Sequence, residues 1–345
     1  MIKIGVIGCG KIAQMRHIPE YAANPNVELV GYYDINQQRA GDLAKKYGGH
    51  AYDSLKALLA ADIDAVSVCT PNYLHAENTI AALKAGKHVL CEKPMAGSIQ
   101  DCEDMMKAAR EAGCFLMLGH NQRLAKAHVK AKELIDSGLI GDIVTFHTTF
   151  FHGGPENWSI DPGPSVWFFD KRRSLMGVMA DLGIHKTDLI HYLTGQTIVE
   201  TTAQLSTIDK KYANGMPIDV DDNAICIYRL SGGAVGTMSI SWTSYGAEDN
   251  STVLYGTRGI MRLYNDPTYS IKVTTREREN ILYQIDGIQT NEKQTRSGVI
   301  DTFIECILEN RVPEISGEEV LKSMRVIFAS IESSETGRAV KVNQN

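Results

Sequence analysis

The fold of the first part of the chain is decided by residues 3–13, Lys3-Ile4-Gly5-Val6-Ile7-Gly8-Cys9-Gly10-Lys11-Ile12-Ala13. A short apolar run typical of a buried strand leads into a glycine turn and then into a helical pattern. In this context Gly8 permits the tight turn, Gly10 lets the backbone approach a pyrophosphate, and Ala13 lets helix and strand pack closely. The helix N-terminus adds free N–H groups. The pattern predicts a dinucleotide site; the alternative is a glycine-rich turn that binds no ligand.

The rest of the first third alternates strand and helix patterns, which is typical of a doubly wound parallel sheet. Strands are expected at residues 3–7, 28–33, 65–69, 88–91 and 115–118. Helices are expected at residues 12–23, 37–47, 55–60, 75–85 and 99–112, the last with Ser98 as its N-cap. We therefore predict an α/β Rossmann domain over residues 1–122.

From about Asn121 the pattern changes, and residues 123–345 are predicted to form an α+β domain with a large, mainly antiparallel sheet. One helix, one strand, a Pro/Gly-rich loop and a further helix come first, and strand patterns follow. The expected elements are helices at 124–137, 180–193, 298–309 and 317–333, and strands at 143–151, 198–207, 224–230, 234–242, 252–255 and 260–264. Residues 276–280 are predicted to be a solvated loop or a sheet edge.

The composition excludes several functional classes. The 345 residues suggest about two domains at roughly 150 residues each, and their net charge is −6. No basic stretch could bind a polyanion, so nucleic acid and anionic membrane are not expected as partners. Seven cysteines, none in a Cys-x-x-Cys arrangement, favour a reducing cytoplasm. Without a leader pattern or 18 consecutive apolar residues, we expect a mature, soluble chain.

Two loops after predicted strands are candidates for cofactor binding. Asp34 ends the second strand, where a carboxylate can accept hydrogen bonds from ribose hydroxyls; its alternative role is a helix N-cap. Ile35-Asn36 follows rather than an arginine, so NAD is favoured over NADP. The loop Thr70-Pro71-Asn72, followed by His75, should flank the dinucleotide, although by itself it could be a capped turn. No proton transfer is assigned to His75.

Two further groups carry candidate chemistry. Glu92-Lys93-Pro94 follows a strand, and Pro94 stiffens the turn that directs Lys93. Asp181 and His185 are four residues apart on a predicted helix and share one face. Taken singly, each has an ordinary structural explanation: a solvated lysine, or a satisfied Asp/His pair. Zinc is disfavoured, because no His-Glu-x-x-His or cysteine-rich arrangement occurs.

Taken together, the chain resembles the glucose-fructose oxidoreductase / inositol dehydrogenase / rhizopine-catabolism (Gfo/Idh/MocA) family of NAD(P)-dependent oxidoreductases over nearly its whole length. The matching motifs are Gly8-x-Gly10-x-x-Ala13, Glu92-Lys93-Pro94 and Asp181-x-Gly183-x-His185-x-x-Asp188. Residues 119–123 are similar to the family's domain-joining segment, although Leu124 stands where an aromatic residue is frequent. Residues 174–177 keep only one glycine of the family's glycine run, which puts the local loop shape in question.

The resemblance implies an active site in a cleft between the two domains and roles for individual residues. Lys93, Asp181 and His185 form the implied catalytic group: His185 accepts the hydroxyl proton, Lys93 faces the oxygen that becomes a carbonyl, and Asp181 stabilises positive charge. No metal is needed. The implied cofactor-binding residues are Gly8, Gly10, Lys11, Ile12, Asp34, Thr70, Pro71, Asn72, His75, Glu92, Lys93 and Asn121.

A long loop at residues 151–173 is expected to carry specificity. Trp158 and Trp167 could pack on a sugar, a cyclitol or the nicotinamide, and His152 and Arg172 could bind hydroxyls or a carboxylate, beside Lys93, Asp181 and His185. The alternative is an aromatic cluster that clamps the loop.

The leading interpretation is an NAD-dependent dehydrogenase of a sugar, sugar derivative or inositol. The resemblance also implies a homodimer or homotetramer that assembles through the second domain. A dinucleotide-binding sensor without catalysis stays open as an alternative. So does an enzyme of the same fold that uses NAD transiently for hydrolysis or dehydration.

Overall fold

The computed structural model describes residues 1–287 and 296–343. The chain divides into two compact units. Within the described residues, the first unit comprises 1–121, 172–175 and 296–321, and the second comprises 122–171, 176–287 and 322–343. That the part before residue 122 binds the nucleotide and the part after it binds the substrate stays a prediction.

The described residues of the first unit form a six-stranded parallel sheet in the order β3-β2-β1-β4-β5-β6. This is the dinucleotide-binding order, in which ligands lie at the carboxyl ends of the strands. The predicted α/β class is confirmed; the two-residue strand β3 is an addition, too short to show a pattern. The strands are β1 (Ile2–Ile7), β2 (Val27–Tyr33), β3 (His50–Ala51), β4 (Ala65–Val68), β5 (His88–Cys91) and β6 (Leu116–Leu118).

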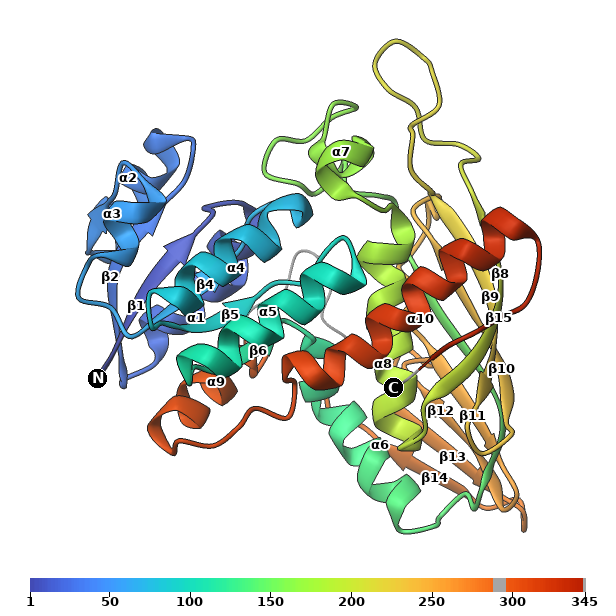
Figure 1. Cartoon of the computed structure of the whole chain (residues 1–345). Coiled ribbons are helices and arrows are strands. Elements are labelled where there is room, and N and C mark those ends of the chain that lie inside the picture. The colour runs from blue at the N-terminus through green and yellow to red at the C-terminus, as the bar shows by residue number, and fades with distance from the viewer. Residues whose placement is uncertain (288–295, 344–345) are drawn as a thin grey trace. The chain divides into compact units, whose positions relative to one another are not determined.

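The helices of the first unit follow the prediction except at the first turn. The predicted helix at 12–23 begins as a π-helical segment, η1 (Ala13–His17), and continues as α1 (Ile18–Ala23). Ser98 caps α5 as expected, because its hydroxyl accepts the Asp101 N–H at 3.0 Å. Helices α4 and α5 run side by side (Figure 1). The remaining helices are α2 (Gln37–Tyr47), α3 (Leu55–Leu59), α4 (His75–Lys84) and α5 (Ile99–Ala112), with a 3₁₀ turn, η2, at Asn72–Leu74.

A segment from the C-terminal part of the chain completes the first unit. Helix α9 (Val299–Leu308) packs against α1, and Ser297 donates its backbone N–H and its hydroxyl to the buried Glu20 carboxylate. Ser316 pairs antiparallel with Met117 at the edge strand β6. The first unit is therefore built from segments that lie far apart in the sequence.

The second unit contains a sheet with nine strands in the described residues, in the order β14-β13-β12-β11-β7-β10-β9-β8-β15. Every neighbouring pair is antiparallel except β7 and β10, which are parallel, so the predicted mainly antiparallel sheet is confirmed. Residues 276–279 join β13 to the edge strand β14, as expected. The strands are β7 (Ile143–Phe151), β8 (Ile198–Ser206), β9 (Asn223–Leu230), β10 (Val235–Ser241), β11 (Thr252–Gly256), β12 (Gly259–Leu263), β13 (Ile271–Thr275), β14 (Asn280–Tyr283) and β15 (Val340–Lys341).

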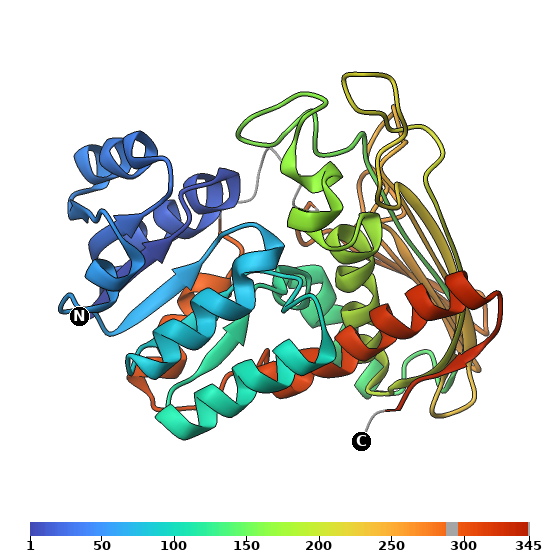
Figure 2. The same cartoon turned by 45° about the horizontal axis from the view of Figure 1, so that its top comes forward.

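Helices cover one face of this sheet (Figure 1): α6 (Lys126–Asp136), α8 (Ile184–Thr194) and the C-terminal part of α10 (Gly317–Thr336). After α10 the chain turns back and adds β15 beside β8 (Figure 2). Strand β9 alternates strictly, and its exposed side chains include Ile225 and Ile227 on the other face. Among the described residues, no helix is long and apolar enough to cross a membrane.

Candidate active site

The glycine turn at the carboxyl end of β1 has the shape that a pyrophosphate needs. Gly8 has φ +89°, and a Cβ there would lie 2.7 Å from the Cys69 carbonyl oxygen, so only glycine fits. At Gly10 the nearest atom to an added Cβ is that same oxygen at 3.9 Å. A side chain at Gly10 would therefore fill open space beside the backbone, and the residues present fit a dinucleotide phosphate group.

Asp34 ties the end of β2 to the glycine turn. One of its carboxylate oxygens accepts the Cys9 N–H at 2.7 Å, and the other accepts the Asn36 N–H at 2.7 Å. The side chain of Asn36, not that of Asp34, caps α2. A carboxylate offers about four acceptor positions, so the two backbone bonds leave capacity for ribose hydroxyls. Burial and the Asp34 charge raise the pKa of the Cys9 thiol to about 12, which keeps that thiol neutral.

The loop after β4 is fixed by its polar side chains. The amide of Asn72 donates to the Ser174 carbonyl at 2.7 Å, so it holds residues 172–175 against the loop. His75 is fully buried, and its two ring nitrogens lie 2.7 Å from the Pro94 carbonyl oxygen and 2.9 Å from that of Thr70. His75 thus links the loop after β4 to the turn after β5.

Glu92 is a buried carboxylate at the end of β5. It lies 2.9 Å from His17 Nε2, and Arg16 Nη1 is 3.6 Å away. Burial alone would raise its pKa, but the hydrogen bond with His17 and the charges around it outweigh burial and lower the pKa to about 2. The backbone N–H of Lys93 donates to the same carboxylate at 3.2 Å. Glu92 is therefore ionised and holds the backbone of the residue that follows it.

In the second unit the predicted pair Asp181 and His185 lies in a buried cluster. Asp181 belongs to the π-helical segment η5 (Met179–Gly183) and His185 to the first turn of α8, and each is at most 7% exposed. Trp242 Nε1 donates to Asp181 Oδ2 at 3.0 Å, and His152 Nε2 lies 3.9 Å from the same oxygen. The Phe150 ring lies against both imidazoles, with centroids 6.2 Å from His185 and 5.7 Å from His152.

His152 has a defined orientation within this cluster. The backbone N–H of Gly154 donates to His152 Nδ1 at 3.0 Å, so the proton of the neutral ring is on Nε2, the nitrogen nearer Asp181. The structure therefore brings together Asp181, His185 and the predicted substrate residue His152. Lys93 belongs to the first unit, and Asp181 and His185 belong to the second. That the three residues act in one reaction is therefore a proposal, which is made below.

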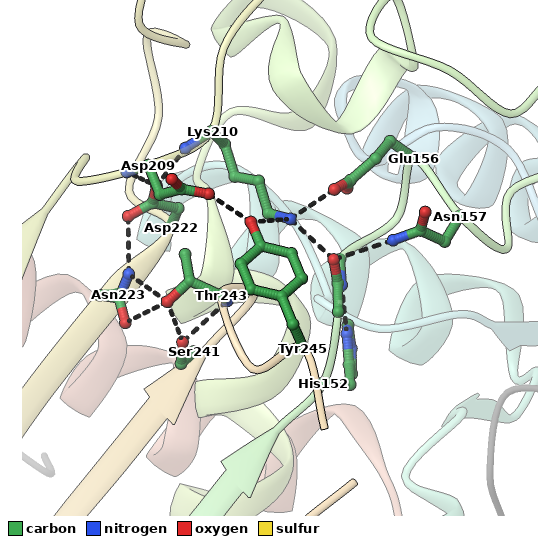
Figure 3. Close-up of polar contacts among 12 residues, drawn as sticks. His152, Glu156, Asn157, Asp209, Lys210, Asp222, Asn223, Ser241, Thr243 and Tyr245 are labelled. Atoms are coloured by element: carbon green, nitrogen blue, oxygen red, sulfur yellow. Dashed lines mark hydrogen bonds and ion pairs between the residues drawn. The ribbon is translucent and has the colours of Figure 1, made fainter. Parts of the chain in front are cut away.

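The loop that follows His152 is anchored by Lys210 (Figure 3). Its ammonium donates to the Gly153 carbonyl at 2.7 Å and to the Tyr245 hydroxyl at 3.2 Å, and it pairs with Glu156. The Asp222 carboxylate accepts three backbone N–H groups from residues 208–210, which fixes the segment that carries Lys210. The start of the loop is thus held by the ion pair between the buried Lys210 and the partly exposed Glu156.

Aromatic side chains pack along the same loop. Trp167 stacks on Phe168 with centroids 3.8 Å apart, Trp158 meets Phe168 at 5.1 Å, and Phe168 meets Trp242 at 6.4 Å. These contacts are those of an aromatic clamp, yet both loop tryptophans are only half-buried and keep surface for a ligand. Arg172 is exposed and belongs to the first unit, in the short helix α7 (Lys171–Ser174).

Comparison with known proteins decides the family. Residues 2–120 match the model of the oxidoreductase family with an NAD-binding Rossmann fold, and residues 128–262 match the GFO/IDH/MocA C-terminal domain. The chain belongs to the GFO/IDH/MocA oxidoreductase family. The resemblance carried by the three motifs is thereby confirmed.

Relatives and solved structures agree with this family. Levoglucosan dehydrogenase of Pseudarthrobacter phenanthrenivorans is 30% identical over 75% of this chain and 72% of its own length. Myo-inositol 2-dehydrogenase of Thermotoga maritima is 26% identical over 99% of both chains. The structure of levoglucosan dehydrogenase in complex with NADH covers 100% of both chains, with a TM-score of 0.89 and 25% identity.

The departure from the family's glycine run has a local explanation. Leu175 has φ +67°, the left-handed region that glycine adopts without strain, so the backbone keeps a glycine-like conformation with a leucine. Gly97 leaves room for it, because a Cβ at Gly97 would lie 2.4 Å from the Leu175 side chain. The retained Gly177 is necessary, because a Cβ there would lie 2.0 Å from the Asp221 carbonyl oxygen.

Several residues around the site were not predicted. Trp242 was only the end of an expected strand, and nothing in its neighbourhood indicates a bond to a carboxylate 61 residues earlier. His17, the partner of Glu92, lies on the first helix at helical spacing and is indistinguishable there from a core residue. Among the described residues, no group of three or more His, Cys, Asp or Glu could hold a metal ion.

Lys186, the residue after His185, is a further buried group without a predicted role. It is 0% exposed; its ammonium donates to the Asn250 carbonyl at 2.9 Å and lies 5.8 Å from the Phe150 ring centre. Burial lowers its pKa to about 7, although the charges of Asp249 and Glu248 oppose the shift. Burial also raises the pKa of Glu248 to about 7.

We expect this buried lysine to make stability depend on pH between about 8 and 10. In the unfolded chain a lysine stays protonated up to about pH 10.4, whereas folded Lys186 has lost its proton, so the free energy of unfolding should rise with pH. At about pH 8 and above, Glu248 is largely ionised and contributes little. Lys186→Met should remove about 1 kcal/mol of increase per pH unit. Urea unfolding of both proteins at several pH values tests this; parallel pH dependences would contradict it.

Proposed function

We propose that this chain is an NAD-dependent dehydrogenase that oxidises a secondary hydroxyl of a sugar, a sugar derivative or inositol. The observation that carries the proposal is the buried cluster in which the Phe150 ring contacts His152 and His185, and Asp181 lies beside His152 and Trp242. It occurs in a chain whose other unit holds the glycine turn and Lys93. The names of the relatives, levoglucosan dehydrogenase and myo-inositol 2-dehydrogenase, support the substrate class.

The proposed chemistry balances in one step. NAD⁺, when bound, supplies the acceptor for the hydride that leaves the hydroxyl-bearing carbon. His185 accepts the hydroxyl proton, and the Asp181 carboxylate stabilises the imidazolium that forms. The Lys93 ammonium stabilises the negative charge on the oxygen as it becomes a carbonyl.

The remaining predicted residues take supporting roles in this proposal. The glycine turn with Lys11 and Ile12 would hold the pyrophosphate, and Asp34 the adenosine ribose. Thr70, Pro71 and Asn121 would line the nicotinamide half beside Lys93. His152, Trp158, Trp167 and Arg172 would contact the substrate. For Asn72, His75 and Glu92, whose side chains bond within the first unit, we propose contact through the loops they shape.

NADH formation with a panel of sugars, sugar derivatives and inositols tests the proposal. Turnover of at least one polyol is expected. Tight NAD⁺ binding without turnover of any member would instead favour a sensor. Net hydrolysis or loss of water without NADH accumulation would favour transient use of NAD.

Replacing Asp34 by serine is expected to weaken the preference for NAD⁺ over NADP⁺. The carboxylate charge repels a 2′-phosphate, and its loss should lower the ratio of the two kcat/KM values by about tenfold, or 1.4 kcal/mol. Asp34→Asn should lower the ratio by a similar factor, because it also removes the charge, while it keeps one oxygen acceptor for the Cys9 or Asn36 N–H. An unchanged ratio in both variants would argue against Asp34 as the ribose ligand.

We also propose a homodimer or homotetramer in a reducing cytoplasm. The exposed apolar residues Ile225, Ile227 and Val235 lie on adjacent strands of the second unit's sheet, and all seven cysteines are free thiols. Light scattering of the purified chain gives its mass, and a monomer at micromolar concentration would contradict the assembly.

A further inference from the structure

The turn that carries Lys93 is held from inside the first unit by two buried histidines, one on each side. His17, from η1, contacts Glu92, the residue before Lys93. His75, from the start of α4, contacts the carbonyl of Pro94, the residue after it. The two histidines are 0% and 1% exposed. Their imidazoles therefore contact the residues on both sides of Lys93 and are shielded from solvent.

The His17 side is a continuous line of hydrogen bonds. Tyr21 Oη lies 2.8 Å from Ser67 Oγ, Ser67 Oγ lies 2.9 Å from His17 Nδ1, and His17 Nε2 lies 2.9 Å from Glu92 Oε1. The ionised Glu92 can only accept, so His17 Nε2 carries a proton. When the ring carries only this proton, Nδ1 accepts a hydrogen bond from the Ser67 hydroxyl, and Ser67 accepts one from the Tyr21 hydroxyl. All three hydrogen bonds then point from Tyr21 towards Glu92.

Glu92 links this line of hydrogen bonds to the backbone of Lys93. Its second oxygen accepts the Lys93 backbone N–H at 3.2 Å. On its other side Gly119 lies so close that an added Cβ would be 3.0 Å from the carboxyl carbon. The carboxylate is therefore confined by packing and oriented by His17, and the Lys93 backbone follows its position.

The His75 side fixes the far end of the turn. The Pro94 carbonyl oxygen lies 2.7 Å from Nδ1 and that of Thr70 lies 2.9 Å from Nε2, so the ring spans the loops after β5 and β4. Burial lowers the pKa of His75, and a neutral ring has one N–H, which we assign to Nδ1, the nitrogen with the shorter contact. Proline has no N–H, so its carbonyl is the group through which the Pro94 backbone can be held by a hydrogen bond.

We propose that His17 and His75 are positioning residues for Lys93, acting through Glu92 and through the Pro94 carbonyl. A lysine side chain is long and flexible, so anchoring its backbone on both sides limits where the ammonium can reach. The inference rests on the proposed function, because it gives Lys93 a part in the reaction.

Matched pairs of variants test the proposal. His17→Leu removes the donor to Glu92, whereas His17→Gln keeps an N–H donor near the Nε2 position. His75→Leu removes the donor to Pro94, whereas His75→Asn keeps one near the Nδ1 position. The first readout is hydrogen exchange of the Lys93 amide, which needs no turnover; the second is steady-state kinetics with the best polyol. Binding of ADP-ribose, which lacks the nicotinamide, reports whether the glycine turn is intact.

We expect the Lys93 amide to exchange at least tenfold faster in His17→Leu, with His17→Gln close to wild type. Both leucine variants should lose at least tenfold in kcat, and the Gln and Asn variants should regain most of it. Their Kd for ADP-ribose should stay within about twofold of wild type.

Two results would overturn the positioning role. One is an unchanged Lys93 amide exchange rate in His17→Leu; the other is an equal loss of kcat in the leucine variants and their polar counterparts. A general structural defect would show as weakened ADP-ribose binding in all four. If wild-type protein turns over no polyol, the proposed function fails, and amide exchange alone decides whether His17 orders the turn.

Discussion

Replacing His185 by asparagine is expected to lower kcat for polyol oxidation by about 10²–10⁴-fold, the range typical of losing a general base. Asparagine is close in size and can donate a hydrogen bond, but it cannot take up the hydroxyl proton. His185 is buried beside Phe150, and the Asp181 carboxylate in the same cluster supplies the negative charge that we expect to stabilise the imidazolium once the proton has moved.

Lys93→Ala should also lose about 10²–10³-fold in kcat, because the charge facing the nascent carbonyl oxygen is removed. Exposed His50 on β3 provides the matched control, and His50→Asn should leave kcat unchanged. Undiminished turnover in both His185→Asn and Lys93→Ala would refute the catalytic assignment.

The second large effect concerns stability. Asp188, the last residue of the Asp181-x-Gly183-x-His185-x-x-Asp188 motif, is 1% exposed. Both of its carboxylate oxygens accept hydrogen bonds from Arg123, from Nε at 2.7 Å and from Nη2 at 2.7 Å. This bidentate pair joins residue 123, the last residue of the domain-joining segment, to the helix that carries His185.

Asp188→Asn keeps the size of the side chain and removes the charge, so a buried guanidinium loses its counter-ion. We expect a loss of about 3–5 kcal/mol in the free energy of unfolding of the second unit, the range for breaking one side of a buried ion pair. The three tryptophans all lie in the second unit, so intrinsic fluorescence during urea unfolding reports on it directly.

Glu133→Gln is the control for this stability prediction, because it breaks an ion pair with Lys130 that lies in the second unit and is exposed at both ends. It should change the free energy of unfolding by less than about 1 kcal/mol. If Asp188→Asn costs no more than this control, the buried pair does not stabilise the second unit in the way described.

The architecture was predictable where a local pattern carries it. Strands β1, β2, β4 and β5 are apolar runs that end in turn residues, and their predicted bounds differ from the observed ones by a residue or none. Four strands in the described residues were not predicted. β3 and β15 have two residues each and show no pattern, and they exist because a neighbouring strand pairs with them. β13 and β14 are longer and alternate in burial, but they were not predicted as strands. The pairing of Ser316 with β6 joins residues about 200 positions apart.

For the candidate site, the sequence predicts which residues take part but not the contacts that surround them. The glycine turn, Lys93, Asp181 and His185 stand out because their types and spacing carry a mechanism or match a family motif. What surrounds them does not: Glu92 was expected to bind the cofactor, and only its contacts with His17 and Arg16 reveal a carboxylate that bonds inward. Trp242 reaches Asp181 because of the three-dimensional fold, which spacing along the chain cannot show.

The contributions from residues 296–321 also bear on the first unit as an isolated piece. A fragment of residues 1–122 would lack α9, the Ser297 donors to Glu20 and the pairing at β6. We expect such a fragment to bind NAD⁺ at best and to have no dehydrogenase activity, because Asp181 and His185 lie outside it.

The central claim, that this chain transfers hydride from a secondary alcohol to NAD⁺, is tested most directly by isotope tracing. The best polyol of the panel, deuterated at its carbon atoms, is incubated with wild-type protein and NAD⁺, and the reduced nicotinamide is examined by NMR. The account predicts one deuterium at C4 of the nicotinamide for each ketone or lactone formed. Product formed without reduced cofactor, or reduced cofactor without deuterium, would contradict it.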